Sequence, residues 1–136
     1  MNEVLFLVYV CWSFLLLGFF LTVQLVTYPN FLSVSRATLS NYEKDHRKRI
    51  TPLVVGLFSI DLSLGLYLLF FDSFISIAVV LSFAVYGVSL LWFLPIHKSL
   101  ETSPSPRLVR FLILRNWVRV CLVLIKCLFL IWLFLS

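Results

Sequence analysis

Long apolar runs divide the chain into four segments that are separated by short polar stretches. The runs cover residues 4–28, 50–71, 74–95 and 112–135. Each has the roughly 20 mostly apolar residues that a helix needs to cross the hydrocarbon core of a bilayer. The runs do not alternate between apolar and polar positions as the strands of a membrane β-barrel do. The pattern therefore predicts an all-α, multi-pass integral membrane four-helix bundle, with residues 1–136 forming a single transmembrane domain.

The polar stretches predict where the spans end. Tyr28-Pro29 is expected to close the first span and Pro95 the third, because proline interrupts the helical hydrogen bonding. Asp72-Ser73 is the whole link between the second and third spans, which predicts a tight antiparallel hairpin. Residues 103–106 form a turn-rich connector before the fourth span. A stripe of small side chains on the second span predicts close helix packing there: Gly56, Ser59 and Ser63.

Composition supports a membrane protein and excludes other classes. Hydrophobic residues make up 62% of the chain, against 45–50% in a typical soluble domain, and only 12% are charged. A chain of 136 residues is too short to bury so much apolar surface in a water-soluble core. This excludes a soluble enzyme, a disordered tail and a nucleic-acid-binding domain, despite the net charge of +5. The main partner is the lipid bilayer.

The basic residues predict the orientation. Lys and Arg gather in the links after the first and third spans, and short loops rich in these residues stay in the cytoplasm. We therefore expect both basic links inside and both termini outside, most simply in the inner membrane of a bacterium. The residues that carry this bias are Arg36, Lys44, Arg47, Lys48, Arg49, Lys98, Arg107 and Arg110.

Three ionisable residues lie well inside the predicted spans: Asp61, Arg119 and Lys126. Each charge near the middle of a bilayer costs about 2.5–3.5 kcal/mol on insertion scales, so we expect these charges to pair. Asp61 lies about 18 Å into the second span at 1.5 Å per residue, between the depths of the other two. The hypothesis is a buried ion network of Asp61 and Arg119 to which Lys126 could add.

Further polar side chains gather toward the cytoplasmic half of all four spans. We interpret them as a pocket for a small ligand, with hydrogen bonding between helices as the alternative. The candidate catalytic residues are Asp61, His46 and Arg119: the acid or the imidazole would move a proton, while Arg119 would polarise an oxygen of the ligand. The candidate ligand-binding residues are Gln24, Tyr28, Arg49, His97, Asn116 and Lys126.

The two histidines raise the question of a cofactor. His46 and His97 lie at the same membrane boundary on different helices, so together they could ligate a haem. Hydrogen bonding at the membrane interface is the alternative for both. Glu43 precedes His46 at the spacing of half a di-iron site, but only one copy of that motif is present, and we predict no metal site.

A set of short motifs in one order covers nearly the whole chain: Gln24-Leu-Val-x-Tyr28-Pro29-x-Phe31, His46-x-x-Arg49-Ile-Thr51, Asp61, Pro95-x-His97-x-x-Leu100, Asn116-Trp117-x-Arg119 and Lys126. This order resembles a family of small four-span bacterial membrane proteins of unknown function. More distantly, the chain is similar to anthrone-oxygenase-like membrane proteins, in having four spans and an Asn…Arg pattern on the last helix. That resemblance implies the oxidation, with little help from cofactors, of an aromatic polyketide or a similar lipophile.

Three functions are compatible with these features. The first is a membrane pocket that binds a small lipophilic molecule such as a quinone or a phenol, and that could also oxidise it. The second is a small proton- or ion-coupled transporter that works as a homo-oligomer, because buried Asp, Arg and Lys serve such relays. The third is a non-catalytic membrane assembly partner, in which the buried charges only hold the bundle together.

Overall fold

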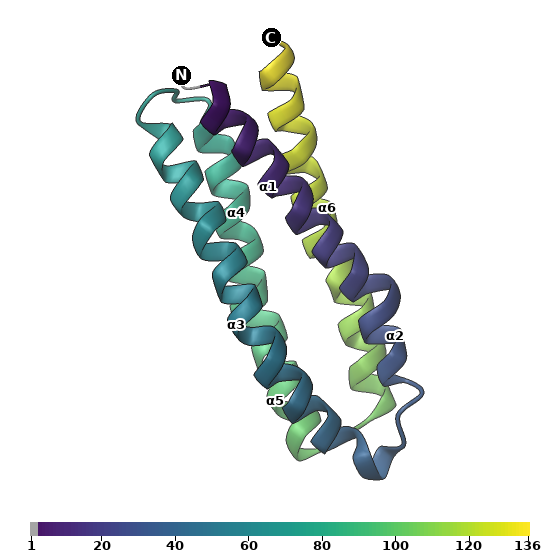
Figure 1. Ribbon diagram of the computed structural model, residues 1–136. Helices are drawn as coiled ribbons and strands as arrows, with labels where there is room; N and C mark the ends of the chain where they lie inside the picture. Colours follow the sequence, from purple (N-terminus) through teal and green to yellow (C-terminus); the bar gives the residue numbers. More distant parts are fainter. Residues whose placement is uncertain (1–2) are drawn as a thin grey trace.

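The structure is a computed structural model that describes residues 3–136. Four helical runs stand side by side along one axis (Figure 1). The first run consists of α1 (Glu3–Thr22), η1 (Val23–Thr27) and α2 (Tyr28–Phe31); the second is α3 (Arg36–Leu69); the third consists of α4 (Ile75–Val88), η2 (Ser89–Phe93) and α5 (Leu94–Thr102); the fourth is α6 (Pro106–Leu135).

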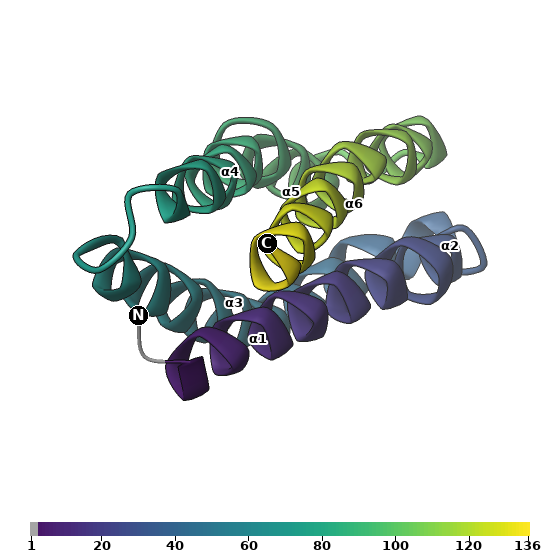
Figure 2. The ribbon, with the colours of Figure 1, turned by 90° about the horizontal axis from the view of Figure 1, so that it is seen from above.

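All four runs in the described part of the chain are long and apolar enough to cross a membrane, which confirms the predicted helical class. Viewed along the axis, α1 lies between α3 and α6, and α4 lies opposite α1 between the same two neighbours (Figure 2). The start of α1, the turn at 70–74 and the end of α6 share one end of the bundle, here called the turn end (Figure 1). The connections at 32–35 and 103–105 lie at the other end, here called the loop end.

The helices extend further at the loop end than the apolar runs do. α3 begins at Arg36 rather than near Ile50, so the charged stretch that precedes the apolar run is helical as well. This extension is held in place: Arg36 Nε donates to the carbonyl oxygen of Pro104 at 3.2 Å, and Ser40 Oγ donates to the carbonyl oxygen of Glu101. The loop end is therefore an ordered helical cap.

Of the two prolines expected to close spans, Pro95 does not end its helix, which continues to Thr102, so that prediction is wrong; the run that contains Pro29 ends two residues later, at Phe31. Each follows a five-residue π-helix, and each stands six residues after the π-helix begins, at Val23 in η1 and at Ser89 in η2. A proline clashes with the carbonyl four residues earlier and has no N–H to offer it. The π-helix widens the turn at that point, so the helix passes the proline and continues. π-Helical turns of this kind are frequent at functional sites.

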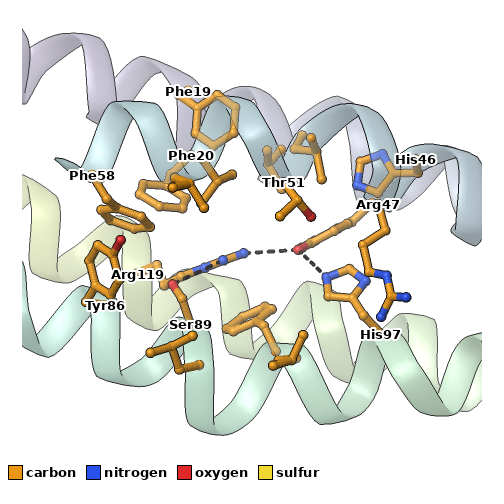
Figure 3. A pocket seen from close by; sticks show the side chains of 18 residues that line it. Phe19, Phe20, His46, Arg47, Thr51, Phe58, Tyr86, Ser89, His97 and Arg119 are labelled. Atoms are coloured by element: carbon orange, nitrogen blue, oxygen red, sulfur yellow. Dashed lines mark hydrogen bonds between the residues drawn. The ribbon is translucent and has the colours of Figure 1, made fainter. Parts of the chain in front are cut away.

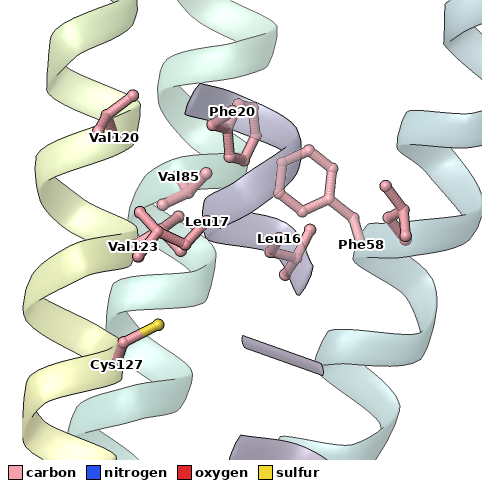
Figure 4. Close-up of a cluster of buried hydrophobic side chains, with 9 residues drawn as sticks. Leu16, Leu17, Phe20, Phe58, Val85, Val120, Val123 and Cys127 are labelled. Atoms are coloured by element: carbon pink, nitrogen blue, oxygen red, sulfur yellow. The ribbon is translucent and has the colours of Figure 1, made fainter. Parts of the chain in front are cut away.

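Three apolar clusters fill the interior along the axis. The middle cluster is drawn in Figure 4, where Phe20 and Phe58 meet Val85, Val120 and Val123 from the other helices. Among the four glycines, Gly65 packs most closely against other helices: an added Cβ would lie 2.7 Å from the hydroxyl of Tyr9. Gly56 has nothing within 4 Å of such an atom, so the predicted close packing there is wrong.

Candidate functional site

A pocket of about 160 Å³ opens in the half of the bundle near the loop end. Phe20, Phe58 and Tyr86 surround one end of it, and His46 and His97 lie at the other (Figure 3). This volume is close to that of an engineered cavity of about 150 Å³ that binds benzene, so the pocket has room for one six-membered ring. The residues that line its exposed side are Thr51, Val55, Leu90 and Leu94.

The two π-helices place the polar groups of this pocket. Tyr28 directly follows η1, while Ser89 and Phe93 are the first and last residues of η2. The rings of Tyr28 and Phe93 are nearly parallel, with centroids 6.4 Å apart and an interplanar angle of 11°. The extra residue in each π turn thus brings the first and third helical runs into contact at the wall of the pocket.

Arg119 is the buried cation of the pocket. Its Nη2 donates to the Tyr28 hydroxyl at 3.0 Å, its Nε donates to Asn116 Oδ1 at 2.8 Å, and its Nη1 lies 3.5 Å from Ser89 Oγ. The guanidinium carbon stands 3.5 Å from the centroid of the Phe93 ring. No carboxylate of residues 3–136 forms an ion pair with it. Arg119 is therefore held by neutral groups, and its charge is not neutralised by an acid.

The Tyr28 hydroxyl joins Arg119 to a second set of residues. It lies 3.3 Å from Nε2 of His97, and Nδ1 of His97 lies 2.6 Å from Oε1 of Glu43. Glu43 is fully buried, and its Oε2 has no hydrogen-bond partner among the described residues. With Nδ1 protonated, His97 donates to Glu43 and accepts from Tyr28. The order carboxylate, imidazole, hydroxyl matches that of catalytic triads in which an acid orients a general base.

A second buried polar cluster lies deeper in the bundle. Lys126 Nζ lies 2.5 Å from Asp61 Oδ1, and Ser82 Oγ donates to Asp61 Oδ2 at 2.6 Å. The ammonium group also stands 4.5 Å from the centroid of the Tyr9 ring. Lys126 follows Arg119 by seven residues, about 10 Å along the helix, and Val120 and Val123 of the apolar cluster lie between them.

The structure therefore divides the predicted ion network. Asp61 pairs with Lys126, one of the pairings that the sequence left open, whereas Arg119 lies two turns earlier on α6 and does not join the network. Neither Asp61 nor Lys126 lines the pocket. Four of the predicted residues do line it: Tyr28, His46, His97 and Arg119.

The remaining candidates serve contacts between helices or face outward. Gln24 Nε2 donates to the carbonyl oxygen of Ile113 at 3.1 Å, and Asn116 Nδ2 donates to that of Phe20 at 3.3 Å. Asn116 also accepts from Arg119, so it supports the pocket from behind. Arg49 is exposed on α3 and does not line the pocket.

Sequence reasoning missed three residues of this site: Glu43, Ser89 and Phe93. Glu43 stands in a strongly basic stretch, which suggested a solvated link, and its spacing to His46 drew attention only to metals. The other two belong to η2, and the one sign of that π-helix in the sequence is Pro95 within a helix that continues.

The histidines are placed differently from what haem ligation requires. Their ring centroids are 6.3 Å apart, but both nitrogens of His97 face protein partners, Glu43 and Tyr28. A haem iron would have to displace one of those contacts. Within residues 3–136, no three His, Cys, Asp or Glu side chains come together as a metal site would require.

Comparisons of the chain with protein-family models, with curated proteins and with solved structures found no match. The function is therefore inferred from the geometry of the site, and the resemblance of the motifs to known families stays a prediction.

Proposed function

We propose that this protein is a membrane-embedded binding protein for a small lipophilic molecule that carries a carbonyl or hydroxyl oxygen. The observation that supports it is the guanidinium of Arg119, buried without an acid partner at the wall of an otherwise mostly aromatic and aliphatic pocket. A buried guanidinium favours an acceptor oxygen, and the volume of about 160 Å³ favours a single ring, as in a phenol or a quinone.

The oxygen of the ligand would lie next to Arg119 Nη1. That nitrogen has only a long contact of 3.5 Å, to Ser89 Oγ, while the other nitrogens of the side chain are held by Asn116 and Tyr28. The N–H groups of Nη1 are thus the ones best placed to turn toward a ligand. The aromatic rings of Phe20 and Phe58 would then pack against the ring of the ligand.

The neighbouring residues supply proton exchange at the same oxygen. Transfer of the Tyr28 proton to His97 Nε2 leaves a tyrosinate beside Arg119, and Glu43 stabilises the resulting imidazolium. The tyrosinate then takes the proton of a bound phenol, which leaves a phenolate beside the same guanidinium. Tyr28 and His97 thus replace Asp61 and His46 as the proposed acid–base groups, and oxidation of the ligand stays a prediction from the resemblance.

The basic loop end is proposed to face the cytoplasm of a bacterial cell, because short links rich in Lys and Arg stay inside. On α3, a span of 20 residues counted back from Leu69 begins at Ile50. The pocket then lies across the boundary between hydrocarbon and headgroups, with His46 on the headgroup side and Phe58 on the hydrocarbon side. A lipophile would enter from the bilayer past the exposed residues Val55 and Leu90.

The transporter and the assembly partner remain the alternatives. The test compares 4-hexylphenol with hexylbenzene, two probes that differ by one hydroxyl, on purified protein in lipid nanodiscs, with empty nanodiscs as the partition blank. We expect the wild type to bind the phenol about tenfold or more tightly, since hydrogen bonds to charged groups contribute about 1.5–3 kcal/mol. Tyr28→Phe should reduce this preference, and Tyr67→Phe, which changes an exposed tyrosine of α3, should leave it unchanged. Equal binding of both probes by the wild type would contradict the proposal.

A further inference from the structure

Arg115 of α6 is half-buried at the outer surface, where it contacts an aromatic ring of η2. Its guanidinium carbon lies 3.9 Å from the centroid of the Phe111 ring, one turn earlier on α6, and 4.9 Å from that of Trp92 on η2. Aromatic rings on both helices thus hold the cation at a fixed position on the surface. The π-helix matters here too, since Trp92 is its fourth residue.

The N–H groups of Arg115 and Trp92 have no hydrogen-bond partner in the described part of the chain. A guanidinium has five N–H donors, yet none of the hydrogen bonds or ion pairs of residues 3–136 involves Arg115. The indole N–H of Trp92, a side chain that is 39% exposed, is also without an acceptor there. Two sets of donors therefore point to an acceptor from outside the chain.

The position of Arg115 along α6 indicates what kind of acceptor would lie near it in a membrane. Twenty residues separate it from Leu135 at the turn end, about 30 Å at 1.5 Å per residue, which equals the thickness of the hydrocarbon core. Arg115 then stands at the boundary of the hydrocarbon core, from which its long side chain can reach the lipid phosphates. Residues close in sequence to Arg115 and Trp92 have exposed apolar side chains, as lipid-facing residues do: Leu91, Leu94, Phe111, Leu114 and Val118.

From this placement we propose that Arg115 and Trp92 bind the headgroup phosphate of an anionic phospholipid. Arginine matches the geometry of a phosphate with two parallel N–H···O bonds, and basic grooves between membrane helices are known sites for anionic lipids. The acyl chains of that lipid would lie along the exposed apolar side chains on the hydrocarbon side of Arg115. Leu94 borders both sites, but neither Arg115 nor Trp92 lines the pocket, so this site does not depend on the proposed ligand.

The test titrates phosphatidylglycerol onto delipidated protein in detergent and counts bound lipids by native mass spectrometry. We expect Arg115→Gln to weaken the tightest phosphatidylglycerol site about tenfold, the amount of one charged hydrogen bond. The affinity of Arg115→Lys for phosphatidylglycerol should lie between those of the wild type and Arg115→Gln, because an ammonium group keeps the charge but cannot form two parallel N–H···O bonds. The matched control is Arg110→Gln, which removes the same charge from an exposed position on the same helix and should leave that site unchanged.

Three other results would overturn the proposal. An equal loss in Arg110→Gln would show that the basic surface attracts lipid without a site at Arg115. Competition by millimolar inorganic phosphate would show a site for free anions rather than for a lipid. A change in oligomeric state in Arg115→Gln at unchanged lipid binding would show that the surface around Arg115 and Trp92 is an interface between copies of this chain. The melting temperature of each variant confirms that it is folded before binding is compared.

Discussion

Arg119 on α6 donates a hydrogen bond of 3.0 Å from Nη2 to the hydroxyl of Tyr28, which lies 91 residues earlier in the chain. The contact joins the last helix to the first, at the point where η1 ends. It also links a cation without an acid partner to the pair of His97 and Glu43. One hydroxyl thus connects the part of the site that would hold a ligand oxygen with the part that would move its proton.

Removing that hydroxyl tests its structural role. In Tyr28→Phe, Arg119 and His97 both lose a buried partner, so we expect the free energy of unfolding to fall by about 1–3 kcal/mol. Unfolding in mixed micelles with increasing SDS, followed by circular dichroism, measures the change. Tyr67→Phe on the exposed face of α3 is the control and should stay within about 0.5 kcal/mol of the wild type. A loss as small as that of the control would contradict the buried contact.

The proton relay can be tested with a coloured probe. Bound 4-nitrophenol should ionise at a lower pH than it does in empty nanodiscs, because Arg119 favours the nitrophenolate and His97 accepts its proton through Tyr28. The absorbance of the phenolate as a function of pH gives the shift directly.

Glu43→Gln keeps the size of the side chain but removes its charge, so the imidazolium of His97 loses its stabilising partner. We expect the nitrophenol titration to move back toward that of empty nanodiscs, while binding of hexylphenol stays within about threefold of the wild type. Glu101→Gln removes an acid of the same loop end that pairs with Arg47, and it serves as the control. The same shift in both variants would show that the titration of bound nitrophenol responds to the total charge of the loop end and not to Glu43 in particular.

The pair of Asp61 and Lys126 allows a double-mutant cycle. Asp61→Leu or Lys126→Leu alone leaves one buried charge without its partner, which should cost about 3–5 kcal/mol of stability. The double variant should recover most of that loss, since an apolar pair suits the apolar surroundings. Hexylphenol binding by the double variant should match that of the wild type, because neither residue lines the pocket. A double variant that is stable but no longer binds would assign the pair a role in function.

The glycines of α3 provide a prediction about packing. Gly65→Ala would place a methyl group 2.7 Å from the Tyr9 hydroxyl and 3.0 Å from Val79 Cγ2, so we expect a loss of about 1–3 kcal/mol. Gly56→Ala meets nothing within 4 Å and should gain up to about 1 kcal/mol from better helix propensity. Melting temperatures of the two variants should therefore move in opposite directions. A shift in the same direction would contradict the helix packing described here.

The sequence alone predicted the four helices well, because runs of about 20 apolar residues are long enough to identify spans without any tertiary information. It did not predict the helical extension over Arg36 to Arg49, which depends on contacts with the distant residues Pro104 and Glu101. It also placed helix ends at Pro29 and Pro95. A π-helix is stabilised by its tertiary surroundings and leaves no reliable local pattern to reveal it.

The candidate site was predicted in part. The cost of burying a charge identified Arg119, and the gathering of polar side chains toward one half of the spans identified Tyr28, His97 and Asn116. The structure brings these four residues together, although their roles stay a proposal. The same reasoning could not decide which acid meets which base, because that choice depends on the rotation of each helix. Glu43 was missed because a carboxylate among five basic residues looks solvated until the fold buries it.

The most direct measurement is the position of 4-bromophenol in crystals of the protein, located by the anomalous scattering of bromine. We predict one strong bromine peak near the exposed side of the pocket, between Thr51 and Leu90, with the phenol oxygen within hydrogen-bond distance of Arg119. Crystals of Arg119→Gln, soaked in the same way, should show a much weaker peak. A peak only on the outer surface, for example beside Trp12, or an empty pocket at saturating probe would contradict the proposed binding site.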